Sequence, residues 1–120
     1  MKAGKEQKYI PERGDIIFID FNPTKGSEQG NPKNKPRPAI IISPLEYNRL
    51  SSLALMCPIT SKSKGLKFEV ALDERTNTKG VILSDQIKCL DWKARKANFK
   101  EKAPLEVIEE VLAKIEPLVL

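Results

Sequence analysis

The stretch Gly14–Ser43, GDIIFIDFNPTKGSEQGNPKNKPRPAIIIS, places two short apolar runs on either side of a long polar segment. The runs, Asp15–Phe21 and Ala39–Ile42, are apolar at consecutive positions and rich in isoleucine. Because a short run that is apolar on both alternating faces is typical of a buried strand, we expect two buried strands. A connection this long in a small domain is either disordered or part of a site, so we look for function there.

The rest of the chain predicts further short strands and two helices. Ser43-Pro44-Leu45-Glu46 has the form of a capping box with Ser43 at the N-cap, which predicts a helix to about Leu50. A second helix should begin after Pro104 and end at Pro117, because its apolar residues recur at steps of three and four. Four more stretches predict strands: Leu53–Ile59, Lys67–Leu72, Val81–Leu83 and Ile87–Leu90. Thr60 stands at the end of the first of these.

This order of elements predicts a mainly β (α+β) domain, a small barrel of antiparallel strands with one short and one terminal helix. No repeat or linker divides the 120 residues, so we expect a single domain over 1–120, with residues 1–8 as a mobile charged leader. Ser84-Asp85-Gln86 interrupts an apolar run, which indicates either a bulge or a site.

The formal charge of +5 and the pI near 9.2 favour an anionic partner such as nucleic acid. Acidic residues gather on the terminal helix, whereas basic residues cluster in three expected loops. If these loops share one side of the fold, they form a groove for a polyanion. The loops are Lys25–Arg37, Lys62–Lys67 and Lys93–Lys102.

Histidine is absent, which excludes a histidine pair as acid and base and excludes histidine-ligated metals. Cys57 and Cys89 lie in apolar runs and form no CxxC motif, so we expect two buried free thiols and no metal or cofactor. No apolar run approaches the roughly 18 residues of a membrane span, and the N-terminus lacks the apolar part of a signal peptide. We therefore expect a cytoplasmic protein without a membrane partner.

A nuclease of this composition has RNA as its natural substrate. The carboxylates near the basic loops, Asp20, Glu28 and Asp85, are too scattered to indicate a metal site. RNA carries its own nucleophile, because the 2′-hydroxyl can attack the adjacent phosphorus and leave a cyclic phosphate and a 5′-hydroxyl. DNA lacks this group.

Four blocks of the chain resemble the MazF/PemK (Kid) toxins of bacterial toxin–antitoxin pairs, in the family's order and spacing: GDIIFIDFNPTKGSEQG, KPRPAIIISPLEYN, CPITSKSKGLKFEV and GVILSDQIKCLDWKAR. The resemblance implies an SH3-like barrel of the CcdB/PemK type and a sequence-specific, metal-independent endoribonuclease that cleaves single-stranded RNA such as mRNA. It also implies a homodimer whose groove is blocked by an acidic segment of a cognate antitoxin. Contact with DNA is implied only through the antitoxin complex.

Carried over residue by residue, the resemblance assigns the family's catalytic arginine to Arg37 and its strand-end threonine to Thr60. The loop glutamate of some members falls on Glu28. An arginine side chain stays charged at physiological pH and suits the negative charge that builds up at phosphorus. A threonine hydroxyl can donate to a phosphate oxygen. Whether Glu28 or Arg37 takes the proton of the 2′-hydroxyl stays open.

Other positions are expected to line the groove, where amides and carboxylates recognise base edges and lysines hold the backbone: Ser27, Gln29, Lys62, Lys64, Asp85 and Gln86. Asp85 and Gln86 could equally belong to the dimer interface. Phe21 and Trp92 are candidates for stacking a base, although a lone aromatic in a strand is more often part of the core. Two other functions stay open, a non-catalytic CcdB-like toxin that binds gyrase and a plain nucleic-acid-binding barrel.

Overall fold

The computed structural model describes residues 9–21 and 35–120. Over these residues seven strands form one sheet, accompanied by two α-helices and a 3₁₀ turn. The elements are β1 (Asp15–Ile19), β2 (Arg37–Ile41), α1 (Leu45–Ser51), β3 (Leu53–Thr60), β4 (Glu69–Ala71), β5 (Val81–Leu83), η2 (Ser84–Gln86), β6 (Lys88–Asp91), β7 (Asn98–Lys102) and α2 (Leu105–Val119).

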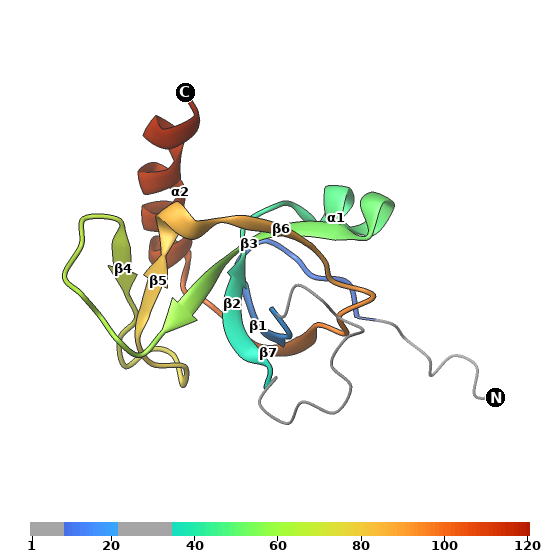
Figure 1. Ribbon diagram of the computed structural model, residues 1–120, viewed down its shortest axis with the longest axis horizontal. Coiled ribbons are helices and arrows are strands. Elements are labelled where there is room, and N and C mark those ends of the chain that lie inside the picture. The colour runs from blue at the N-terminus through green and yellow to red at the C-terminus, as the bar shows by residue number, and fades with distance from the viewer. Residues whose placement is uncertain (1–8, 22–34) are drawn as a thin grey trace.

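The recorded strand pairs are all antiparallel, and the main path through the sheet is β4-β5-β3-β2-β1-β7 (Figure 1). β3 is long enough to share one edge between two partners, because its first half pairs with β6 and its last two residues pair with β5. Within the described residues, the path ends at β4 and β7 without joining them. The predicted mainly β fold with two helices is confirmed, but the sheet is open and does not close into a barrel.

The sheet buries both of its faces, which explains why its central strands are apolar at consecutive positions. Ile16 and Ile40 of one face pack in a cluster with Val111 of α2. Ile17 and Met56 belong to a second cluster on the opposite face, which includes Trp92. Figure 1 shows α2 beside the β4 and β5 end of the molecule and α1 near β6. The strand ends that face neither helix are left for a site.

The start of α1 differs from the predicted capping box. Pro44 occupies the N-cap position and no side chain caps the helix. The Ser43 hydroxyl instead donates to Asn48 Oδ1 at 2.5 Å and accepts the backbone N–H of Leu55 at 2.9 Å. Because the Ser43 hydroxyl makes these two hydrogen bonds, it links α1 to β3 and does not cap the helix.

Two predicted boundaries also shift. β1 ends at Ile19, two residues before the expected Phe21. α2 continues through Pro117 to Val119, so the prediction that Pro117 ends the helix was wrong. The missing N–H of this proline falls in the last turn, where only one hydrogen bond is lost.

The expected basic loop Lys93–Lys102 is wrong in its second half, because Asn98–Lys102 form β7 and pair with β1. β7 is the last strand of the path, and its polar and charged composition is how edge strands avoid unwanted pairing. The same composition gives the strand no alternating apolar pattern, so the sequence did not predict it.

Two further expectations need correction. Cys57 is buried as predicted, but Cys89 on β6 is exposed. Ser84-Asp85-Gln86 form the 3₁₀ turn η2 between β5 and β6, so the interruption of the apolar run is not a bulge. Ser84 is fully buried in this turn, and its carbonyl oxygen accepts the Cys57 thiol at 3.8 Å. The turn buries Ser84 and leaves the side chains of Asp85 and Gln86 exposed.

Candidate active site

Arg37 and Thr60 come together at the end of two paired strands. The register of β2 and β3 pairs Ala39 with Pro58, and carried two residues further it sets Arg37 opposite Thr60. Directly opposite residues of an antiparallel pair have Cβ atoms about 4.5–5.5 Å apart. The extended register therefore places the guanidinium-bearing residue and the hydroxyl-bearing residue at the same end of the sheet.

Both residues line one open cavity of about 420 Å³. Arg37 is exposed and Thr60 is half-buried. Thr60 Oγ1 accepts the backbone N–H of Lys62 at 3.2 Å, which leaves its hydroxyl proton to be donated to a ligand. The complete lining is Arg37, Pro38, Ile59, Thr60, Ser61, Lys62 and Lys79. Three cations and a hydroxyl around one opening are suited to a phosphate group.

Lys79 reaches this cavity because β5 pairs with the end of β3, where Thr60 lies opposite Val81. Its ammonium donates to the carbonyl oxygen of Thr76 at 2.9 Å, and a lysine has further N–H groups for a ligand. Lys79 was not among the residues predicted to line the site. In the sequence, Lys79 is marked only by its position before Gly80 and a buried strand. This position does not show which strand pairs with the buried one.

The turn before Lys79 is held by Glu101 of β7. The Glu101 carboxylate accepts the backbone N–H groups of Asn77 and Thr78 and the Thr78 hydroxyl, at 2.6–3.1 Å. Partial burial acts to raise the pKa of Glu101, but the hydrogen bonds from Thr78 and Asn77 outweigh it and hold the pKa below its ordinary value. An ionised glutamate on one strand thus fixes the turn that carries Lys79.

The basic loop after Thr60 is folded around Glu69 of β4. The Glu69 carboxylate accepts the Ser63 hydroxyl at 2.6 Å and the backbone N–H of Lys64 at 2.9 Å, with a further contact to the N–H of Gly65. These hydrogen bonds, from Ser63 first and then from Lys64, lower the pKa of Glu69. Lys62 lies on the cavity side of this loop, while Lys64 does not line the cavity.

The other predicted site residues separate into three groups. Asp85 and Gln86 are exposed in η2, which packs against α2 and β3, and they do not line the Arg37–Thr60 cavity. Phe21 is half-buried and packs against the cluster around Ile17. Trp92 is 8% exposed and its indole N–H donates to the Asn48 carbonyl at 3.0 Å, so it belongs to the core. Three predicted residues lie outside the described residues: Ser27, Glu28 and Gln29.

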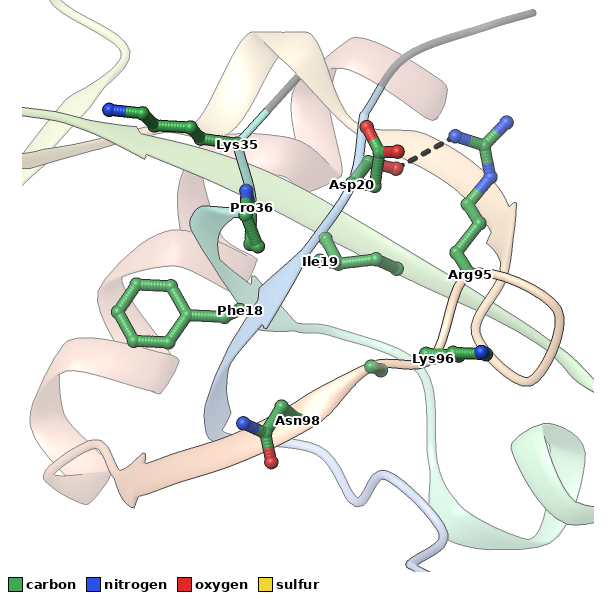
Figure 2. Close-up of a pocket in the computed structure, with 9 residues that line it drawn as sticks. Phe18, Ile19, Asp20, Lys35, Pro36, Arg95, Lys96 and Asn98 are labelled. Atoms are coloured by element: carbon green, nitrogen blue, oxygen red, sulfur yellow. Dashed lines mark hydrogen bonds between the residues drawn. The ribbon is translucent and has the colours of Figure 1, made fainter. Parts of the chain in front are cut away.

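A second and larger cavity, of about 600 Å³, is lined by the two residues that precede Arg37. Figure 2 shows Phe18 extending from β1 with Pro36 and Asn98 on either side of it. The Arg95 guanidinium donates to the Asp20 carbonyl oxygen at 2.8 Å. The complete lining is Phe18, Ile19, Asp20, Lys35, Pro36, Arg95, Lys96, Ala97 and Asn98. Parts of all three basic segments therefore meet around Lys35–Pro38.

Residues 12–119 match the family model described as the PemK-like, MazF-like toxin of type II toxin-antitoxin systems. This chain belongs to that family. The endoribonuclease toxin MazF of Escherichia coli K12 is 42% identical over 112 residues, which cover 93% of this chain and 96% of the relative. The endoribonuclease PemK of Escherichia coli is 34% identical, over 87% of this chain and 78% of the relative.

Solved structures of the family have the same fold. Crystalline MazF from Deinococcus radiodurans has a TM-score of 0.81 and 38% identity, over 93% of this chain and 98% of the solved one. A MazE–MazF crystal structure from the same organism has a TM-score of 0.80 and 34% identity, over 93% and 97%. The open antiparallel sheet with two helices is thus the architecture of the MazF-like toxins.

None of the helices in residues 9–21 and 35–120 could span a membrane by its length and apolar content. No group of three or more His, Cys, Asp or Glu side chains is gathered there in a way that could hold a metal ion.

Proposed function

We propose that this MazF-like endoribonuclease toxin cleaves single-stranded RNA, including mRNA, at specific short sequences and without a metal. In the proposed reaction the ribose 2′-hydroxyl attacks the adjacent phosphorus and displaces the 5′-oxygen, which leaves 2′,3′-cyclic phosphate and 5′-hydroxyl ends. The observation that carries the proposal is that Arg37 and Thr60, on paired strands, line one cavity with two lysines. Binding alone does not require this pairing.

Each described residue has a role that fits its position. The Arg37 guanidinium stabilises the negative charge that develops on the phosphorane oxygens. The Thr60 hydroxyl donates to one of these oxygens, because the N–H of Lys62 engages an oxygen lone pair and leaves the hydroxyl proton for a ligand. Lys62 and Lys79 hold neighbouring phosphates, a task that requires charge but little geometric precision.

Proton transfer completes the proposed reaction. We assign Glu28 as the candidate base that takes the proton of the 2′-hydroxyl, because it is the carboxylate nearest in sequence to Arg37 within the loop, and the departing 5′-oxygen takes a proton from water. Ser27 and Gln29 beside it are proposed to contact RNA, as are Lys64, Asp85, Gln86 and Phe21 at the periphery. No cofactor takes part in this scheme.

The proposed partners follow from the family and the charge. A cognate antitoxin with an acidic segment would cover the basic cavities of a chain whose net charge is +5, and solved MazE–MazF complexes resemble this chain. The proposal includes a homodimer, a cytoplasmic location, and contact with DNA only through the antitoxin complex.

The test is cleavage of an unstructured RNA by the purified chain in the presence of EDTA, with chemical analysis of the product ends. We expect 2′,3′-cyclic phosphates on the RNA and no cleavage of an all-deoxy strand of the same sequence. Arg37→Ala should retain binding but lose cleavage, whereas Arg49→Ala, which removes an arginine of α1 outside the cavity, should cleave normally.

A second pair of variants tests the hydroxyl. Thr60→Val keeps the shape of the side chain and removes the donor, and a lost transition-state donor reduces kcat by about 10²-fold or more. Thr60→Ser restores a hydroxyl and should recover most of the rate. Cleavage that requires a metal, or that survives Arg37→Ala, would contradict the mechanism. RNA binding without any cleavage would favour the plain binding barrel.

A further inference from the structure

The larger cavity beside the Arg37–Thr60 site has the size and lining of a pocket for a flat aromatic ligand. Its volume of about 600 Å³ falls within the range of about 300–1,000 Å³ typical of ligand pockets. Phe18, Ile19 and Pro36 supply apolar surface, while Lys35, Lys96 and Asn98 supply polar groups. A nucleobase combines an apolar face with polar edges, so this lining matches it.

Phe18 provides the stacking surface. The register of the sheet sets Phe18 opposite Asn98 of β7 and opposite Pro38 of β2, so the three side chains form a row across three strands. The ring is only half-buried, and Lys100 Nζ lies 5.2 Å from its centroid. An aromatic ring with a cation beside it is the combination that binds a base and its phosphate in single-stranded nucleic acid.

Lys96 offers an independent argument. Its backbone has φ of 54°, in the left-handed region that favours glycine or asparagine over lysine. A lysine at this position is less favourable for the backbone than glycine, and this lysine lines the cavity. Arg95, beside it, donates to the carbonyl oxygen of Asp20 and so ties this turn to the end of β1.

Consecutive residues of the chain line the two cavities. Lys35 and Pro36 line the larger cavity, and Arg37 and Pro38 line the smaller one. β1 and β2 are neighbours in the sheet, and Arg37 lies opposite Ile19, the residue that follows Phe18. We propose that the Phe18 cavity binds the base of a nucleotide that flanks the scissile phosphate, and that it helps to set the cleavage sequence. This inference rests on the proposed ribonuclease function.

The experiment compares wild type with Phe18→Leu, Phe18→Trp and Lys96→Gly on an unstructured RNA whose cleavage points are first mapped. The same RNA is then made with an abasic site at each nucleotide flanking one cleavage point. The matched control is Phe99→Leu, an identical change at the next residue of β7 after Asn98, outside the cavity. Binding of the uncleaved all-deoxy strand is measured in parallel.

We expect Phe18→Leu to lower kcat/KM about tenfold or more, as the loss of a stacked base does. One abasic position should penalise wild type and Phe18→Trp but not Phe18→Leu, and Phe99→Leu should behave as wild type. Lys96→Gly should bind the strand more weakly while its melting temperature stays equal or rises, which a purely structural lysine would not do.

Three results separate the alternatives. No cleavage by wild type would refute the ribonuclease function, whereas the binding measurements would still test the pocket. Normal cleavage by wild type with an unchanged abasic profile in Phe18→Leu would overturn the pocket alone. Unchanged cleavage by the variants together with weakened binding of a poly-glutamate peptide would assign the cavity to a protein partner and also overturn it.

Discussion

Gly80 controls how closely the Lys79 turn can approach Thr60. Its φ of +120° lies in the region that side chains rarely adopt, and a Cβ atom there would lie 2.2 Å from the Thr60 carbonyl oxygen. The obstacle is backbone and cannot move aside without disturbing the end of β3. One glycine therefore permits both the β3–β5 pairing and the placement of a lysine in the Arg37–Thr60 cavity.

Gly80→Ala should destabilise the fold by about 2–4 kcal/mol, because backbone strain adds to the steric clash. It should also lower RNA cleavage by moving Thr60. Gly65→Ala is a matched control, since Gly65 also has positive φ but has nothing within 4 Å of the added Cβ, and it should cost only about 1–2 kcal/mol. Urea unfolding compares the two variants. Equal losses of stability would contradict the close approach.

The two thiols should react very differently. Burial, and secondarily the charge of Asp85, raises the pKa of Cys57 to about 12, so this thiol stays protonated at pH 8. Cys89 is exposed on β6. We expect iodoacetamide at pH 8 to alkylate Cys89 and to spare Cys57 in the folded chain, as peptide mass spectrometry would reveal. Native Cys89→Ser should take up no label, and both sites should be labelled in denaturant.

At the scale of elements, the Lys79 turn depends on a strand distant in sequence. The Glu101 carboxylate fixes this turn through three donors. Its pKa is lowered in the fold, so the unfolded chain binds the proton more readily and this stabilisation is present above about pH 4.5 and lost as the pH falls further. The turn should therefore loosen in acid before the sheet does.

Glu101→Gln tests this connection. At pH 7 the variant should lose about 1 kcal/mol of stability and bind RNA more weakly, because the amide replaces a charged acceptor and Lys79 is held less firmly. The difference from wild type should shrink below pH 4.5, where wild type loses the same charge. Glu109→Gln, on the exposed side of α2, is the control and should match wild type at every pH.

The elements that the sequence predicted well are those whose residues are dictated by burial. Strands β1, β2 and β3 and helix α2 have apolar patterns that follow directly from packing on both faces of the sheet. β7 escaped prediction because an edge strand needs charge more than apolar alternation. The openness of the sheet depends on which strands pair at its ends, and apolar patterns carry no such information.

The site divides in the same way. Arg37 and Thr60 were predicted by the resemblance to the MazF/PemK family, and in the structure both line one cavity. Lys79 and the Phe18 cavity depend on the β3–β5 and β1–β7 pairings, which join residues far apart in the chain. Asp85 and Gln86 were predicted to line the groove or the dimer interface. In the structure they lie in η2, which packs against α2, and the sequence alone does not reveal this contact.

At the scale of the whole molecule, the charge of +5 should dominate the strength of RNA binding. With phosphates at Arg37, Lys62 and Lys79, the logarithm of the affinity should fall with the logarithm of salt concentration with a slope of about −2 for single strands. Fluorescence anisotropy with an uncleaved all-deoxy strand measures this slope.

Lys62→Ala and Lys79→Ala should each make the slope shallower by about 0.7, because each removes one phosphate contact. Lys88→Ala removes a lysine of β6 outside the cavity and should leave the slope unchanged, although it lowers the net charge by the same amount. Equal effects of all three variants would indicate that only the overall charge attracts RNA.

Arg37 and Thr60 are each held by a strand pairing at the end of the sheet. Arg37 lies opposite Ile19 of β1, and Thr60 lies opposite Val81 of β5. Because both pairings belong to one sheet, heat that melts the sheet should abolish RNA cleavage at the same temperature.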